Sequence, residues 1–211
     1  MSQKMKKCPG KFAVYFYHLI IQFMNSESLM DFLKSITALP VDLITSLESE
    51  LHQENYKAKQ IIHAAGQLEN RVFFLNSGFA RNYFYDHHGN EHTVKFWESG
   101  DIMFSYEGYY KVPSYFYTEI IEETSVITLP YAYLHELDKT FPEISIIIKS
   151  LLLQFQHDEY EKQVLIALPT EERYRILKTN KPNLFKKLPN RIIASYLHMT
   201  RETLTKLIAK N

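Results

Sequence analysis

The sequence has a single cysteine, Cys8, and no apolar run close to the ~20 residues that a membrane-spanning helix needs. One cysteine cannot build a disulfide framework, a cysteine-ligated zinc site or an iron–sulfur site within one chain, and its scarcity fits a reducing cytoplasm. Internal repeats, low-complexity segments and a recognisable Ser-His-Asp or Cys-His arrangement are also lacking. We therefore expect a cytoplasmic protein that is not an enzyme and has no cofactor, metal or membrane anchor.

Net charge is absent as well, because 24 Lys and Arg balance 24 Asp and Glu. The balance hides an asymmetry: residues 171–211 carry ten basic against three acidic side chains, and residues 1–170 carry 14 against 21. A basic tail on an acidic body is typical of a tail that meets a polyanion. A basic face that is merely solvated has the same composition.

What the chain does contain changes in character along its length. Apolar residues at helical spacing predict a helix over 26–36 and a second helix from Pro40. From residue 56 to 129, short aromatic and β-branched runs alternate with turn signals such as DHHGN at 86–90, which predicts an antiparallel barrel or jelly roll. Residues 1–25 read as an N-terminal extension, with Met24 as an alternative start, and we disfavour a signal peptide.

A long helix is predicted to follow, opening at Phe141-Pro142-Glu143. Its apolar stripe includes Ile144, Ile148, Leu151 and Phe155. The stripe can pack on the chain's own barrel, but an equivalent helix from a second subunit would bury it better. The sequence therefore predicts a homodimer with these four residues at its interface.

The last forty residues predict a small basic helical domain that ends in two short helices. One covers Asn190 to Leu197, His198-Met199 forms a tight turn, and Thr200 caps a second helix to about Lys210. Two short helices joined in this way form a helix-turn-helix, whose second helix fits the DNA major groove. Arg, Glu and Thr near the start of that helix can bond base edges or phosphates. His198 stands where the turn usually has Gly, so it is expected to need a positive φ.

The order of these parts resembles the Crp/Fnr family of bacterial transcription regulators over about Leu29 to Asn211. The local matches are EERYRIL at 171–177 and LPNRIIASYLHMTRETLTKL at 188–207. The resemblance implies base reading by Arg201, Glu202 and Lys206, with Asn190, Arg191 and Thr200 near phosphates. Thr203 lies in the same first turn, and the C-terminal wing of many family members is expected to be absent or vestigial.

The resemblance also implies an α+β fold divided into four parts. Residues 1–25 form the extension, 26–140 a cyclic-nucleotide-binding-like effector domain, 141–168 the dimerisation helix, and 169–211 the helix-turn-helix domain. The implied partners are an inverted-repeat double-stranded DNA operator, a second copy of the chain and RNA polymerase.

The effector pocket departs from the cyclic-nucleotide-binding pattern. Phe104-Ser105-Tyr106 stands where the family has Gly-Glu-Leu, and Ser114-Tyr115 stands where it has the phosphate-binding Arg and its neighbour. A cyclic phosphate needs a guanidinium, and no Arg occurs between Gly100 and Ile120. We predict that cyclic AMP does not bind, and that Phe104, Ser105, Ser114 and Tyr115 line a pocket for another ligand, flat and apolar, or for none.

Two other readings stay open at this point. One is a cupin-like jelly-roll metalloenzyme with an accessory helical domain, for which His88 and His92 would be ligands. The spacing of His87, His88 and His92 in DHHGNEH favours exposed hairpin histidines instead. The other is a regulator that has lost DNA binding and acts through protein contacts.

Overall fold

The computed structural model describes residues 26–210, so the predicted extension over 1–25 lies outside the described residues. A helix over residues 26–36 comes first. The elements that follow it are α2 (Val41–Glu50), β1 (His52–Tyr56), β2 (Ile61–His63), β3 (Arg71–Tyr85), β4 (Glu91–Glu98), β5 (Ile102–Met103), α3 (Tyr106–Tyr109), β6 (Tyr117–Pro130), α4 (Tyr131–Thr140), α5 (Pro142–Ala167), α6 (Thr170–Asn180), α7 (Leu184–Lys187), α8 (Asn190–Tyr196) and α9 (Arg201–Lys210). Helices around one antiparallel sheet confirm the predicted α+β class. Within 26–210, no helix is both long and apolar enough to cross a bilayer.

The sheet has the order β1-β6-β3-β4, with β2 added to β6 and β5 added to β3. The pairing of the two long strands, β3 and β6, shifts register between Leu75 and Ala80, around Gly78. Gly78 has φ +106°, and a Cβ there would lie 2.2 Å from Thr124 Oγ1. Only glycine fits where the two strands approach so closely, so this irregular part of the β3–β6 pairing requires Gly78.

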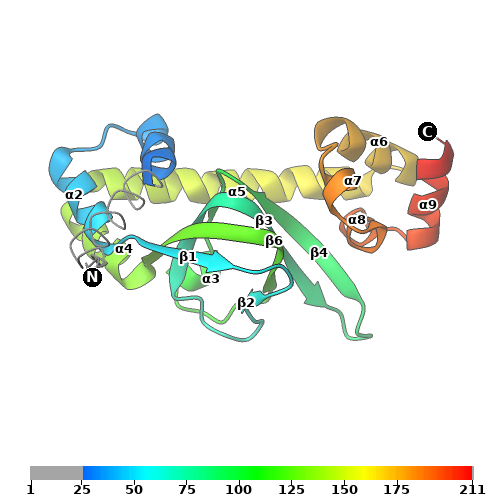
Figure 1. The fold of residues 1–211 in the computed structure, drawn as a ribbon, viewed down its shortest axis with the longest axis horizontal. Coiled ribbons are helices and arrows are strands. Elements are labelled where there is room, and N and C mark those ends of the chain that lie inside the picture. The colour runs from blue at the N-terminus through cyan, green and yellow to red at the C-terminus, as the bar shows by residue number, and fades with distance from the viewer. Residues whose placement is uncertain (1–25, 211) are drawn as a thin grey trace, which may run out of the picture.

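The helix α5 runs the length of the molecule and joins its two ends (Figure 1). The N-terminal helices and α4 lie at one end, the barrel lies along its side, and α6 to α9 lie at the other end (Figure 1). A first hydrophobic core lies between the N-terminal helices, α4, α5 and the sheet. A second core fills the barrel around Phe73, Trp97 and Ile120.

Three of the four α5 residues predicted for a dimer interface are covered by the chain itself, which corrects the prediction for those three. Ile144, Ile148 and Leu151 belong to the first core and are at most 9% exposed, packed with residues such as Leu33 and Leu47. Phe155 is half-buried, and its ring lies 5.1 Å from Lys95 Nζ. The N-terminal helices therefore supply the partner that the sequence reading assigned to a second subunit.

A different face of α5 carries exposed apolar side chains. Ile146, Leu153, Tyr160 and Val164 are 48%, 67%, 57% and 65% exposed. They are spaced by seven, seven and four residues, which is the heptad spacing of a coiled-coil seam. These side chains keep about half or more of their surface exposed in the described part of the chain, so this face of α5 is open to another helix.

Candidate nucleic-acid interface and ligand cavities

The two helices at the chain's end form a compact helix-turn-helix. Ile193 and Leu197 of α8 and the following turn, with Leu204 of α9, are fully buried. Thr200 caps α9, because its Oγ1 accepts the backbone N–H of Thr203 at 3.1 Å. One side of α9 therefore anchors the motif, while its opposite side faces outward.

The turn between α8 and α9 uses a left-handed residue without glycine. His198 has φ +51°, and the next N–H, of Met199, donates to Ala194 O at 3.0 Å. The positive φ expected at this position is thus present. This left-handed backbone conformation costs free energy for a residue that, unlike glycine, has a Cβ. Arg173 of α6 holds the turn from behind, since its Nη1 donates to the carbonyls of Leu197 (2.6 Å) and His198 (3.0 Å).

The residues predicted to contact DNA fall into two groups. Arg201, Glu202 and Lys206 are exposed on the outer side of α9, and Thr200 is exposed at its cap. Thr203 is half-buried and bonded to Thr200, so its hydroxyl serves the cap. The remaining two residues, Asn190 and Arg191, open α8, where the first is half-buried and the second is exposed.

The helix-turn-helix is docked on the barrel of its own chain through β4. Ser195 Oγ donates to Glu91 O and accepts the N–H of Thr93, both at 2.8 Å. Since β4 is an edge strand of the sheet, these bonds satisfy backbone groups that would otherwise face solvent. The ring of Phe96 on β4 lies 4.8 Å from the Tyr196 ring at an angle of 39°, and both residues belong to a third hydrophobic core shared by the barrel and the C-terminal helices.

Ion pairs surround this joint, and each joins an acidic barrel residue to a basic residue of the helical domain. They are Glu91–Arg191 (2.7 Å), Glu122–Lys187 (2.6 Å) and Glu98–Lys181 (3.3 Å). The charge asymmetry read from the sequence is therefore also an intramolecular contact. The predicted phosphate contact Arg191 is one of the cations already engaged.

A buried arginine that was not predicted from the sequence, Arg81, lies next to Glu91. Arg81 is 1% exposed and bonds Glu91 at 2.7 Å, Glu119 at 2.6 Å and Thr93 Oγ1 at 2.9 Å. Burial opposes its charge, but the two carboxylates outweigh burial and raise the pKa of Arg81. Arg81 lies on β3 and its partners lie on β4 and β6, so only the folded sheet reveals the cluster.

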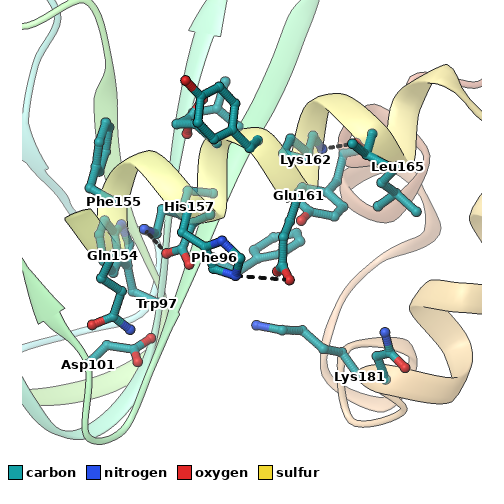
Figure 2. A pocket seen from close by; sticks show the side chains of 18 of the residues that line it. Phe96, Trp97, Asp101, Gln154, Phe155, His157, Glu161, Lys162, Leu165 and Lys181 are labelled. Carbon is teal, nitrogen blue, oxygen red and sulfur yellow. Dashed lines mark hydrogen bonds and ion pairs between the residues drawn. The ribbon is translucent and has the colours of Figure 1, made fainter. Parts of the chain in front are cut away.

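Beside this joint, residues of β4, α5 and α6 line a cleft of about 680 Å³ (Figure 2). Lys162 crosses it: its Nζ donates to Tyr196 O at the end of α8 and lies 3.0 Å from the centre of the Tyr196 ring. Burial, opposed by Glu159 and helped by Arg173, lowers the pKa of Lys162 to about 7. On the barrel side, Lys95 bonds Asp158 at 2.5 Å.

A second cavity, of about 280 Å³, lies inside the barrel. All four residues predicted for the effector pocket line it: Phe104, Ser105, Ser114 and Tyr115. Ser105 Oγ accepts Gly108 N–H at 3.0 Å, and Ser114 Oγ accepts Phe116 N–H at 3.1 Å, so both hydroxyls shape local turns. Among the described residues that line the cavity there is no arginine.

The hairpin histidines do not converge. His87 and His88 are exposed, whereas His92 Nε2 bonds Asp86 Oδ2 at 2.9 Å. Hydrogen bonds from Asn90 and His92 lower the pKa of Asp86. Over residues 26–210, no group of three or more His, Cys, Asp and Glu side chains is placed to hold a metal ion.

Residues 53–140 match the family model of the cyclic nucleotide-binding domain. Similar solved structures include FixK2 from Bradyrhizobium japonicum (17% identity, 76% of this chain and 83% of that chain, TM-score 0.65) and the c-di-GMP-responsive global regulator CLP from Xanthomonas campestris (14%, 79% and 89%, 0.61). A transcriptional regulator of the CRP/FNR family from Thermus thermophilus is also similar (19%, 75% and 84%, 0.59). No protein of curated function matches the sequence significantly. These likenesses establish the fold and confirm the predicted resemblance to Crp/Fnr regulators.

Proposed function

We propose that this chain, which has the fold of Crp/Fnr regulators, is a homodimeric, sequence-specific DNA-binding transcription regulator. The observation that carries the proposal is the division of α9 into two sides. Leu204 is fully buried against α8, while Arg201, Glu202 and Lys206 project from the outer side. A helix held in this way presents hydrogen-bonding side chains to the major groove.

The proposed contacts follow from position on the two helices. Arg201 and Glu202 lie in the first turn of α9, where side chains reach base edges first, and Lys206 lies one turn later. Thr200 and the start of α8, with Asn190 and Arg191, are proposed to lie near phosphates. Thr203 is proposed to act through the cap, because its hydroxyl is bonded to Thr200.

The proposed dimer uses the exposed seam of α5, not the stripe predicted from the sequence. Ile146, Leu153, Tyr160 and Val164 form a row that a second α5 would bury. A dimer with a two-fold axis at this seam would present its two copies of α9 to DNA in opposite orientations. The operator would therefore consist of two inverted half-sites. Acting on such a site in the cytoplasm, the dimer would influence RNA polymerase.

Cyclic AMP is not proposed as the effector. The described lining of the cavity inside the barrel lacks an arginine, and Glu107 lies in the first turn of α3 beside it. A cyclic phosphate placed there would meet a carboxylate without its usual guanidinium.

Selection from a pool of random duplexes tests the proposal. The full-length protein should enrich one sequence motif made of two inverted half-sites about one helical turn, ~34 Å, apart. Enrichment of a single half-site would remove the dimer from the proposal. A pool that stays random after repeated rounds would remove sequence-specific DNA binding itself.

A further inference from the structure

The cavity inside the barrel combines aromatic walls with carboxylates. Phe73, Trp97, Phe116 and Phe155 are among the rings that line it, and Glu69, Glu107 and Glu159 are its carboxylates. Trp97 Nε1 donates to Asn82 Oδ1 at 3.0 Å, so the donor of the indole is already used. The cavity therefore offers a ligand aromatic rings and hydrogen-bond acceptors.

Positive charge in the cavity is scarce and already engaged. Lys95 is the single lysine among the described lining residues; its Nζ bonds Asp158 at 2.5 Å and lies 4.3 Å from the Trp97 ring centre. Glu107 accepts a bond from Ser105 Oγ at 3.1 Å, and among residues 26–210 no Lys or Arg forms an ion pair with it. An anionic ligand would face uncompensated carboxylates, whereas a cation would be attracted.

A buried histidine points to the same chemistry independently. His63 lines the cavity, is 8% exposed, and lies with Nδ1 3.2 Å from Glu69 Oε2. Its Nε2 is buried without a hydrogen-bond partner in the part of the chain that the structure describes. Burial lowers the pKa of His63, with the Gln67 carbonyl and Glu107 opposing, so the ring is neutral at neutral pH. The Gln67 carbonyl can only accept, so the ring nitrogen bonded to it, Nδ1, carries the proton, and Nε2 is an acceptor that lacks a donor.

We propose that this cavity binds a small organic cation, with an ammonium group held by Glu107 and His63 and an apolar body against the aromatic rings. An ammonium carries three donors and no acceptor, which matches a site made of carboxylates and a free imidazole nitrogen. Aromatic faces attract such a cation directly. As the effector of a DNA-binding regulator, this ligand rests on the proposed function, but its binding does not require DNA.

Trp97 reports on the cavity, because it is the one tryptophan of the whole sequence. The protein, without DNA, would be titrated with butylamine, phenethylamine and benzyltrimethylammonium, and in parallel with butyrate, phenylpropionate and cyclic AMP. At least one amine should give a saturable change in Trp97 fluorescence, and the anions should give none at equal concentration. Binding by the anions, or by none of the amines, would overturn the proposal.

A matched pair of variants places the ammonium. Glu107→Gln should weaken amine binding by roughly tenfold or more, because a charge-assisted bond becomes a neutral one. Glu123→Gln removes an exposed carboxylate of β6 that does not line the cavity and should leave amine binding unchanged. Equal affinities in the two variants would remove Glu107 from the site. Because no step involves DNA, failure here is distinct from failure of the regulator proposal.

Discussion

At the scale of single residues, His198 gives the helix-turn-helix its turn in a backbone conformation that is unfavourable for a residue other than glycine. The turn between α8 and α9 needs a positive φ, and His198 supplies it at +51°. Replacing His198 with Gly should raise the free energy of unfolding by about 0.5–1 kcal/mol, because glycine adopts this backbone without a Cβ clash. Replacing it with Val should lower that free energy by at least as much. Urea unfolding checks both; a Val variant as stable as the wild type would show that the turn is unstrained.

A second residue-scale prediction concerns pH and Lys162. Burial lowers the pKa of this lysine from its usual 10.5 to about 7. Between those values the unfolded chain binds the extra proton, so stability should rise with pH from 7 to 9. Lys162→Met should flatten this rise, because no group at that position then titrates. A slope unchanged in the variant would show that another group causes it.

The two helices of the helix-turn-helix and the turn between them could be predicted from the sequence because they depend on local rules. A cap at Thr200, apolar residues at helical spacing and a break at His198 all lie within twenty residues. The Arg81 cluster could not be read in this way. Its partners Glu91 and Glu119 lie ten and 38 residues away, and they meet Arg81 only when three strands pair.

At the scale of elements, α5 shows why three of the four residues predicted for the dimer interface lie in the chain's own core instead. Apolar residues lie on more than one side of this helix, so periodicity predicts a helix but does not say which side faces the chain's own core. The N-terminal helices cover Ile144, Ile148 and Leu151, and the row that includes Leu153 is left exposed. Which side of α5 is buried depends on the other elements that pack against it, and the sequence pattern of the helix alone does not contain this information.

The seam on α5 gives an element-scale prediction. Leu153→Glu should place like charges together in a dimer and yield a monomer that keeps its fold, because Leu153 is 67% exposed in the chain. Leu151→Glu should instead unfold the protein, since Leu151 is buried in the first core. Sedimentation and circular dichroism separate the two outcomes. A Leu153→Glu protein that still dimerises would place the interface elsewhere.

The joint between β4 and α8 gives another prediction. Ser195→Ala leaves the N–H of Thr93 without its partner, which should cost about 1–3 kcal/mol of stability. Ser49→Ala, on the exposed end of α2, is the control and should cost much less. Trp97 fluorescence and far-ultraviolet circular dichroism should report one transition in the wild type, because barrel and helical domain share a core. Unchanged stability in Ser195→Ala would show that the joint is not held by this bond.

At the scale of the whole molecule, the uneven charge has two consequences. The basic C-terminal helices suit a polyanion, and three of their cations already pair with barrel carboxylates. The basic residue of each pair is exposed, so solvent weakens the ion pair and a phosphate of bound DNA can replace the carboxylate. DNA binding by this chain would therefore exchange intramolecular carboxylates for phosphates at Arg191 and its neighbours, and it should weaken steeply with salt.

The central claim is that α9 reads bases, and affinity for two duplexes tests it most directly. Wild type, Arg201→Ala and Arg191→Ala would each be titrated with the selected inverted repeat and with a random duplex, over a series of salt concentrations. Arg201→Ala should lose about 1–3 kcal/mol on the inverted repeat and little on the random duplex. Arg191→Ala should weaken binding to both duplexes and reduce the salt dependence, because a phosphate contact carries no base information. Equal losses on both duplexes for Arg201→Ala would contradict base reading by α9.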